Sequence, residues 1–171
     1  MTDSEFCEAF RTHKDALLRF AYRMTGTADA AEDVVQECFV VLWKRGDTFD
    51  GSRGTARAFL FGIARNLLLK RLRWEYRRAE WDVDDVAAEP WDIEGLERAE
   101  AVSRAVQALP PLQREVLILV EYEEMSLEET ATATGAELAA VKSRLHRARK
   151  GLREMLAPYL ETKGNTYETR R

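Results

Sequence analysis

Apolar residues near the start of the chain recur at alternating steps of four and three residues. This spacing places side chains on one face of a helix, whereas a strand would need steps of two. Comparable stripes recur in segments 31–45, 56–78 and 96–109, and only four prolines and nine glycines interrupt the 171 residues. The sequence therefore predicts an all-α fold. The first stripe consists of Phe6, Phe10, His13, Leu17, Phe20 and Met24.

Several helix ends are also marked in the sequence. Gly26 follows the first stripe, where a residue in the left-handed conformation commonly ends a helix. Asp29 can cap the second helix, with Glu32 three residues later in capping-box position. Thr55 can cap the third helix through its side-chain oxygen.

The second half of the chain contains a pair of short helical segments with a glycine between them. Ser126 can cap the first, with Glu129 completing a capping box, and Gly135 breaks it. The second helix is expected from about Glu137 to beyond Lys150. Two short helices joined by a glycine turn are typical of a helix-turn-helix.

Charge is strongly segregated along a chain whose formal net charge is only −4. Segment 53–78 has eight basic residues against one carboxylate, segment 80–100 has nine carboxylates against one arginine, and segment 137–153 has six basic residues against one carboxylate. This pattern favours two nucleic-acid-facing modules joined by an acidic connector. We therefore expect two small helical domains, over residues 1–78 and 96–160, an acidic linker over 79–95 and a polar tail over 161–171.

The third helix combines cations, an aromatic residue, an amide and a glycine on one face. Cations can follow phosphates, an aromatic ring can stack on a base, and an amide can read a base edge, so this face suits single-stranded DNA. Gly62 costs a helix about 1 kcal/mol relative to alanine, which indicates that something approaches closely there. An ordinary solvated basic face is the alternative. The face consists of Phe59, Gly62, Asn66, Lys70, Arg73 and Arg77.

The second helix carries an acidic and polar face that includes Asp33, Gln36 and Glu37. Carboxylates near a helix N-terminus are favoured by the helix dipole and by water, which is one explanation. A docking surface for a basic partner protein is the other, and the periodicity alone leaves both open.

The basic segment near the C-terminus would form the second helix of the helix-turn-helix. Such a helix lies in the DNA major groove, with its N-terminal residues reaching base edges. The small residues Ala139 and Ala140 would allow close approach. A solvated basic helix is the alternative. The residues placed to reach bases and phosphates are Lys142, Ser143, Arg144, His146 and Arg147.

Other classes of function find little support in the sequence. No spacing offers a carboxylate–metal cluster, an activated nucleophile or a glycine loop for phosphates, so we expect no enzyme, no cofactor and no metal. Apolar runs such as 116–120 are too short to span a bilayer, and no charged-then-apolar leader opens the chain. We expect a cytoplasmic protein without membrane insertion.

Four segments in order, "AEDVVQECFVVLWKR", "FLFGIARNLLLKRLR", "LPPLQREVLIL" and "SLEETATATGAELAAVKSRLHRARKGL", resemble the sigma-70 family of bacterial transcription initiation factors. The likeness is greatest to the short extracytoplasmic-function (ECF) subgroup and covers about residues 8–157. Its most specific pieces are "IARN" (63–66) and "VKSRLHRARK" (141–150). Departures include Phe59 where tryptophan is usual, Lys70 where aspartate is frequent, and Thr130 at a position that is usually isoleucine.

The resemblance implies that the first domain docks on the clamp helices of the RNA polymerase beta-prime subunit through Asp33, Gln36 and Glu37. It also implies that this domain binds and melts the promoter −10 element, while the second domain reads the −35 element beside the beta flap. An anti-sigma factor is an expected further partner. The implied −10 residues are Phe49, Asp50, Phe59, Asn66, Lys70, Arg73 and Arg77, and the implied −35 residues are Glu137, Ala139, Ala140, Lys142, Ser143, Arg144, His146, Arg147 and Lys150.

A stand-alone helix-turn-helix regulator that binds duplex DNA without polymerase is the alternative function. The single-strand face of the third helix argues against it, because a duplex-only regulator has no use for such a surface.

Overall fold

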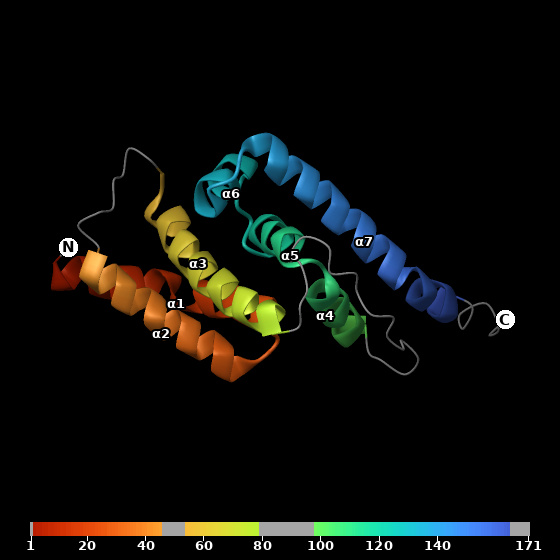
Figure 1. Cartoon of the computed structure of the whole chain (residues 1–171), viewed down its shortest axis with the longest axis horizontal. Coiled ribbons are helices and arrows are strands. Elements are labelled where there is room, and N and C mark those ends of the chain that lie inside the picture. The colour runs from red at the N-terminus through yellow and green to blue at the C-terminus, as the bar shows by residue number, and fades with distance from the viewer. Residues whose placement is uncertain (1, 46–53, 79–97, 165–171) are drawn as a thin grey trace.

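A computed structural model describes residues 2–45, 54–78 and 98–164, and within these ranges every regular element is helical (Figure 1). The prediction of an all-α fold is confirmed. The elements are α1 (Asp3–Thr25), α2 (Ala28–Arg45), α3 (Ala56–Arg78), α4 (Arg98–Ala108), α5 (Pro111–Leu117), the π-helical turn η3 (Ile118–Tyr122), α6 (Leu127–Thr134) and α7 (Leu138–Gly164).

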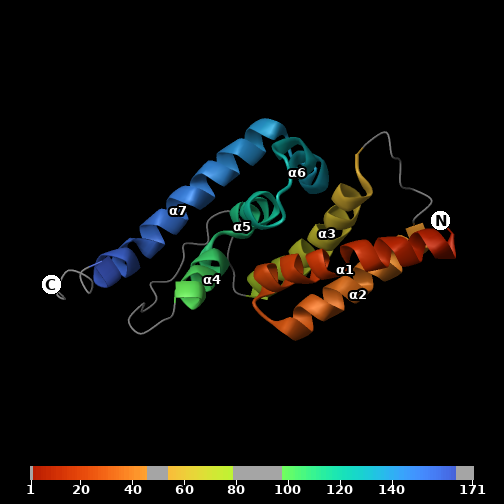
Figure 2. The same cartoon turned by 180° about the vertical axis from the view of Figure 1, so that it is seen from behind.

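The first bundle consists of α1, α2 and α3, which pack side by side in both views (Figures 1 and 2). The C-terminal part of the first stripe is fully buried, whereas Phe6 and His13 are only half-buried and Phe10 is 38% exposed. Phe10 instead lies against Phe39 of α2, with ring centroids 4.8 Å apart. The core of this bundle includes Leu17, Phe20, Met24, Val34, Cys38, Leu60, Phe61 and Leu68.

Most of the predicted helix ends are confirmed. Gly26 ends α1 with φ 79°, and the Thr55 hydroxyl accepts a hydrogen bond from the Ala58 N–H at 3.1 Å. The prediction for Asp29 is wrong, because α2 begins at Ala28, two residues before the start at Ala30 that an Asp29 cap would give. The Thr27 carbonyl already accepts the bond from the Ala31 N–H, so Asp29 lies inside the first turn, where its charge still favours the helix dipole.

The second bundle consists of α4 to α7, and α6 and α7 form the predicted helix-turn-helix. Ser126 and Glu129 make both hydrogen bonds of the capping box. Gly135 ends α6 with φ 64°. Helix α7 begins at Leu138 and continues to Gly164, into the segment expected as a tail.

The two bundles pack against one another instead of standing apart. Helix α3 lies against α6 and α5, and α1 lies against α4, so that buried residues of both bundles form one hydrophobic cluster. Arg114 of α5 donates a 2.7 Å hydrogen bond to the Met24 carbonyl at the end of α1. The same guanidinium also donates to the carbonyls of Gln107 and Leu109 within its own bundle.

The substitution Thr130→Val should stabilise the protein by about 1 kcal/mol, because the Thr130 hydroxyl is fully buried and has no hydrogen-bond partner among the described residues. Thr134→Val is the matched control, since the buried Thr134 hydroxyl donates a 2.7 Å hydrogen bond to the Thr130 carbonyl and its loss should destabilise. Urea unfolding measures both. Equal effects of the two substitutions would contradict this account.

Candidate nucleic-acid interface

Helix α3 presents only part of its predicted strand-binding face to solvent. Asn66 and Lys70 are exposed, whereas Phe59 is half-buried and packs against the core. Phe49 and Asp50 lie outside the described residues. Arg73 and Arg77 belong to helix α3, but the structure does not describe their side chains. The DNA roles of these residues remain predictions.

The close approach predicted at Gly62 is real, and its partner is the protein's own α6. A Cβ atom at Gly62 would lie 3.2 Å from the carbonyl oxygen of Ala133, which is tighter than ordinary van der Waals contact. Gly62 therefore lets the main chain of α6 lie directly on α3. At Gly62, the predicted strand-binding face is therefore occupied by the first helix of the helix-turn-helix, whereas Asn66 and Lys70 of that face stay exposed.

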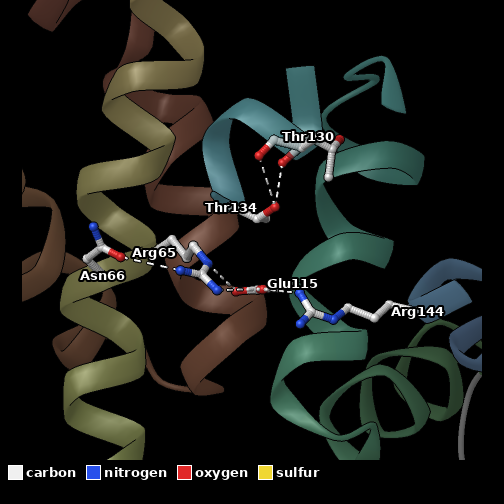
Figure 3. A network of polar contacts seen from close by, with 7 residues as sticks. Arg65, Asn66, Glu115, Thr130, Thr134 and Arg144 are labelled. Atoms are coloured by element: carbon white, nitrogen blue, oxygen red, sulfur yellow. Dashed lines mark hydrogen bonds and ion pairs between the residues drawn. The ribbon is translucent and has the colours of Figure 1, made fainter. Parts of the chain in front are cut away.

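A buried carboxylate links α3 to α7, the second helix of the helix-turn-helix (Figure 3). Glu115 of α5 is fully buried and accepts two hydrogen bonds from Arg65, at 2.8 Å from Nε and 3.1 Å from Nη2. Arg144 of α7 approaches the same carboxylate at 3.9 Å. Burial raises the pKa of Glu115, and the hydrogen bond and charge of Arg65 oppose that rise. The guanidinium of Arg65 also donates to the side-chain oxygen of Asn66, at 3.4 Å.

A second buried carboxylate lies farther along the same contact. Glu123 is 1% exposed at its side chain, and three arginines of the first bundle surround it. Arg19 and Arg57 lie 3.7 Å from its Oε2 atom, and Arg23 lies 3.9 Å from its Oε1 atom. Arg57 also donates a hydrogen bond to the Glu123 carbonyl. Burial raises the pKa of Glu123, and the charges of Arg19, Arg23 and Arg57 oppose that rise.

Sequence reasoning missed Glu115 and Glu123. The run 111–124 has the pattern of one amphipathic helix, but its end widens into the π turn η3. The Glu123 N–H consequently bonds to the Ile118 carbonyl, five residues back, at 3.0 Å. The one available signal of burial was the position of these glutamates close to the apolar run 116–120.

Helix α7 keeps most of its cations in solvent. Arg147 donates a 2.9 Å hydrogen bond to the Ser143 hydroxyl. Arg144 differs from its neighbours, because its side chain is only 24% exposed and lies against Glu115. Ala140 and Ser143 are half-buried. Among the residues predicted to contact the −35 element, the exposed ones are Glu137, Ala139, Lys142, His146, Arg147 and Lys150.

Helix α2 exposes its predicted docking face. Asp33, Gln36 and Glu37 all lie in solvent, and Asp33 pairs with Arg71 at 3.0 Å. Gln36 also borders an apolar groove of about 580 Å³ between α1 and α2, where the Trp43 side chain is 53% exposed.

Family comparisons match both bundles. The sigma-70 region 2 family matches residues 9–81, and the sigma-70 region 4 family matches residues 99–152. The RNA polymerase sigma-E factor of Streptomyces coelicolor is 35% identical over 156 residues, which cover 89% of this chain and 86% of that protein.

The chain belongs to the ECF subgroup of the sigma-70 family.

The ECF RNA polymerase sigma factor SigE of Mycolicibacterium smegmatis is 34% identical to this sigma factor over 160 residues. That match covers 89% of this chain but 62% of the relative's length.

Two solved structures share the arrangement of helices. The sigma factor RpoE in complex with the anti-sigma factor NepR, from Bartonella quintana, superposes with TM-score 0.72 at 29% identity and covers 90% of this chain and 97% of that chain. CnrH in complex with the cytosolic domain of CnrY gives TM-score 0.68 at 26% identity, over 92% and 90% of the two chains. Among the described helices of this sigma factor, none combines the length and apolar character that crossing a membrane requires.

The substitution Glu115→Ala should lower the free energy of unfolding by about 3–5 kcal/mol. The reason is that it leaves the guanidinium groups of Arg65 and Arg144 without the carboxylate that they pair with. Glu121→Ala is the matched control. Glu121 pairs with Arg149 on the surface, at 2.8 Å from Nε, and such exposed pairs contribute about 0.2–1 kcal/mol. Urea unfolding of both variants measures the difference, and a similar loss in each would refute the ranking.

Proposed function

We propose that this chain binds core RNA polymerase and directs it to promoters by reading two DNA elements, without covalent chemistry or a cofactor of its own. Residues 1–78 would dock on polymerase and bind the −10 element, residues 96–160 would read the −35 element, and the acidic segment 79–95 would join them. The observation that supports this most is the pairing of two sigma-region bundles in one chain with exposed polar and cationic residues on α3 and α7.

The first bundle would open the DNA by binding its melted strand. Unstacking a base costs a few kcal/mol, and captured bases and backbone contacts can offset that cost without ATP. Phe49, Asp50, Phe59 and Asn66 would receive bases. Lys70, Arg73 and Arg77 would hold phosphates, and the exposed positions of Asn66 and Lys70 are compatible with these roles.

The second bundle would place α7 in the major groove of the −35 element. The N-terminal residues of such a helix reach base edges while the following cations hold phosphates. Glu137, Ala139 and Lys142 are exposed at this end of α7, so contact with DNA would require no rearrangement of their side chains. The beta flap of polymerase would hold this bundle in place. The remaining candidate contacts are Ala140, Ser143, Arg144, His146, Arg147 and Lys150.

The acidic face of α2 would contact the beta-prime clamp helices, and an anti-sigma factor would control the chain. The exposed carboxylates of Asp33 and Glu37 suit a basic partner, and the apolar groove beside Gln36 adds surface that a partner can bury. The RpoE structure was solved with the anti-sigma factor NepR, which supports the proposal of such control. The CnrH structure likewise contains a protein partner, the cytosolic domain of CnrY.

The substitution Asp33→Arg should weaken binding to core polymerase by about tenfold or more, because it reverses a charge within the proposed docking face. Gln36→Ala should weaken binding in the same direction. Arg71→Ala is the control, since it removes the Arg71–Asp33 ion pair but keeps the carboxylate, and it should bind like the wild type. Titration of fluorescent core enzyme measures all of these affinities. Equal losses for Asp33→Arg and Arg71→Ala would point to a structural effect instead.

Binding of the polymerase complex to −35 duplex DNA should fall with salt at a log–log slope of about −4, if α7 contacts four or five phosphates. Arg147→Ala should make that slope shallower by about 1, whereas Arg104→Ala on α4 should not change it. Fluorescence anisotropy over a salt series gives the slopes. Tight, sequence-specific binding by the chain alone in a mobility-shift assay would instead favour the stand-alone regulator.

A further inference from the structure

Arg144 lies on the flank of α7 that faces α5, not on the outer face of the helix. Val141, Leu145 and Ala148 are buried and mark the inner face of α7. Residues four apart lie on the same side of a helix, so Arg144 shares its side with Ala140, and both are half-buried. The Nη1 atom of Arg144 is buried and has no hydrogen-bond partner among the described residues. The end of this side chain is therefore turned toward protein.

The group that Nη1 approaches is the carboxylate of Glu115 on α5, in the same bundle (Figure 3). The two groups lie 3.9 Å apart, which is within ion-pair distance but longer than a hydrogen bond. Arg65, which donates two hydrogen bonds to Glu115, belongs to the first bundle. Among the described residues of the second bundle, Arg144 is the one cation at ion-pair distance from Glu115. Because a buried carboxylate is costly without a counter-charge, withdrawing Arg144 toward DNA would remove the charge that its own bundle supplies.

Arg147, three residues farther along α7, has a different environment. Its side chain is exposed and donates a 2.9 Å hydrogen bond to the Ser143 hydroxyl. Lys142 is exposed as well. Lys142 and Arg147 can therefore reach phosphates or bases without leaving a buried acid unpaired, whereas Arg144 cannot.

We propose that Arg144 is a positioning residue for the −35 element, which holds α7 on α5 through Glu115 and makes no contact with DNA. This role rests on the function proposed above and deepens it, because it decides which side chains of α7 would read the element. Arg144 leaves the set of candidate DNA contacts. The contacts then fall to the exposed side chains, above all Lys142 and Arg147.

Two matched substitutions separate a positioning role from a DNA contact. Arg144→Met and Arg147→Met each remove one charge and keep an unbranched side chain. The probe is a fluorescent −35 duplex enriched from a random pool by the wild-type chain bound to core polymerase. Fluorescence anisotropy over a salt series gives the affinity of each complex and its log–log salt slope. Loss of one phosphate contact makes that slope shallower by about 1.

Arg144→Met should weaken binding of this duplex by about tenfold, because a tilted α7 no longer meets the base edges correctly. Preference over a scrambled duplex should fall by a similar factor, and the salt slope should stay that of the wild type, since no phosphate contact is lost. Arg147→Met should instead make the slope shallower by about 1. A slope for Arg144→Met that falls as much as that for Arg147→Met overturns the proposal.

A double-substitution cycle tests whether Arg144 acts through Glu115. Once Glu115→Gln has removed the carboxylate charge, Arg144→Met should cost little further affinity. Arg147→Met should lose the same factor in either background. Losses from Glu115→Gln and Arg144→Met that simply multiply overturn the proposal. Arg144→Lys keeps a positive charge beside Glu115 and should recover most of the affinity, and no recovery would contradict a role that depends on charge.

Urea unfolding of the same variants measures this coupling without polymerase or DNA, after far-UV circular dichroism has established that each is folded. Arg144→Met should lower the unfolding midpoint in the wild-type background and lower it less in Glu115→Gln. Equal shifts in the two backgrounds overturn the role assigned to the Glu115 contact. Failure of the wild type to bind core polymerase refutes the proposed function, and the unfolding cycle still decides whether Arg144 holds α7 through Glu115.

Discussion

The burial of Glu115 is the constraint on which the packing of the two bundles depends. A carboxylate without solvent exposure is costly unless opposite charges and hydrogen-bond donors surround it. Arg65 of α3 supplies two hydrogen bonds, and Arg144 of α7 supplies a second positive charge. Because Glu115 and its two partners lie on three different helices, one side chain sets the spacing of α3, α5 and α7. Around it, the apolar residues of both bundles close into one cluster.

The parts of the fold that depend on local chemistry could be predicted from the sequence. Thr55, Ser126 and Gly135 start or end helices through contacts with residues only a few positions away. A short stretch of sequence is therefore enough to recognise their capping hydroxyls or the conformational freedom of glycine. Asp29 shows the limit of such reasoning. Thr27 and Asp29 are two plausible helix starts within one turn, and the sequence does not say which carbonyl takes the first bond.

The parts that depend on distant segments could not be predicted. Apolar residues in segment 111–124 recur with helical spacing throughout, yet the π turn η3 interrupts the α-helix there. Glu123 follows this turn directly and pairs with Arg57 of the first bundle. For the candidate site, periodicity placed Asn66, Lys70 and Lys142 on accessible faces, as the structure does. The glycine signal at Gly62 was also sound, but a missing side chain says only that something comes near. It does not identify the neighbour.

The tight fit at Gly62 has a consequence for substitutions at this position. A Cβ atom there would come within 3.2 Å of the Ala133 carbonyl oxygen, so any side chain would push α6 away from α3. Under the proposed function Phe59 and Asn66 contact DNA from the same face of α3. A change at this one residue would therefore alter both the packing of the two bundles and the surface that α3 offers to a DNA strand.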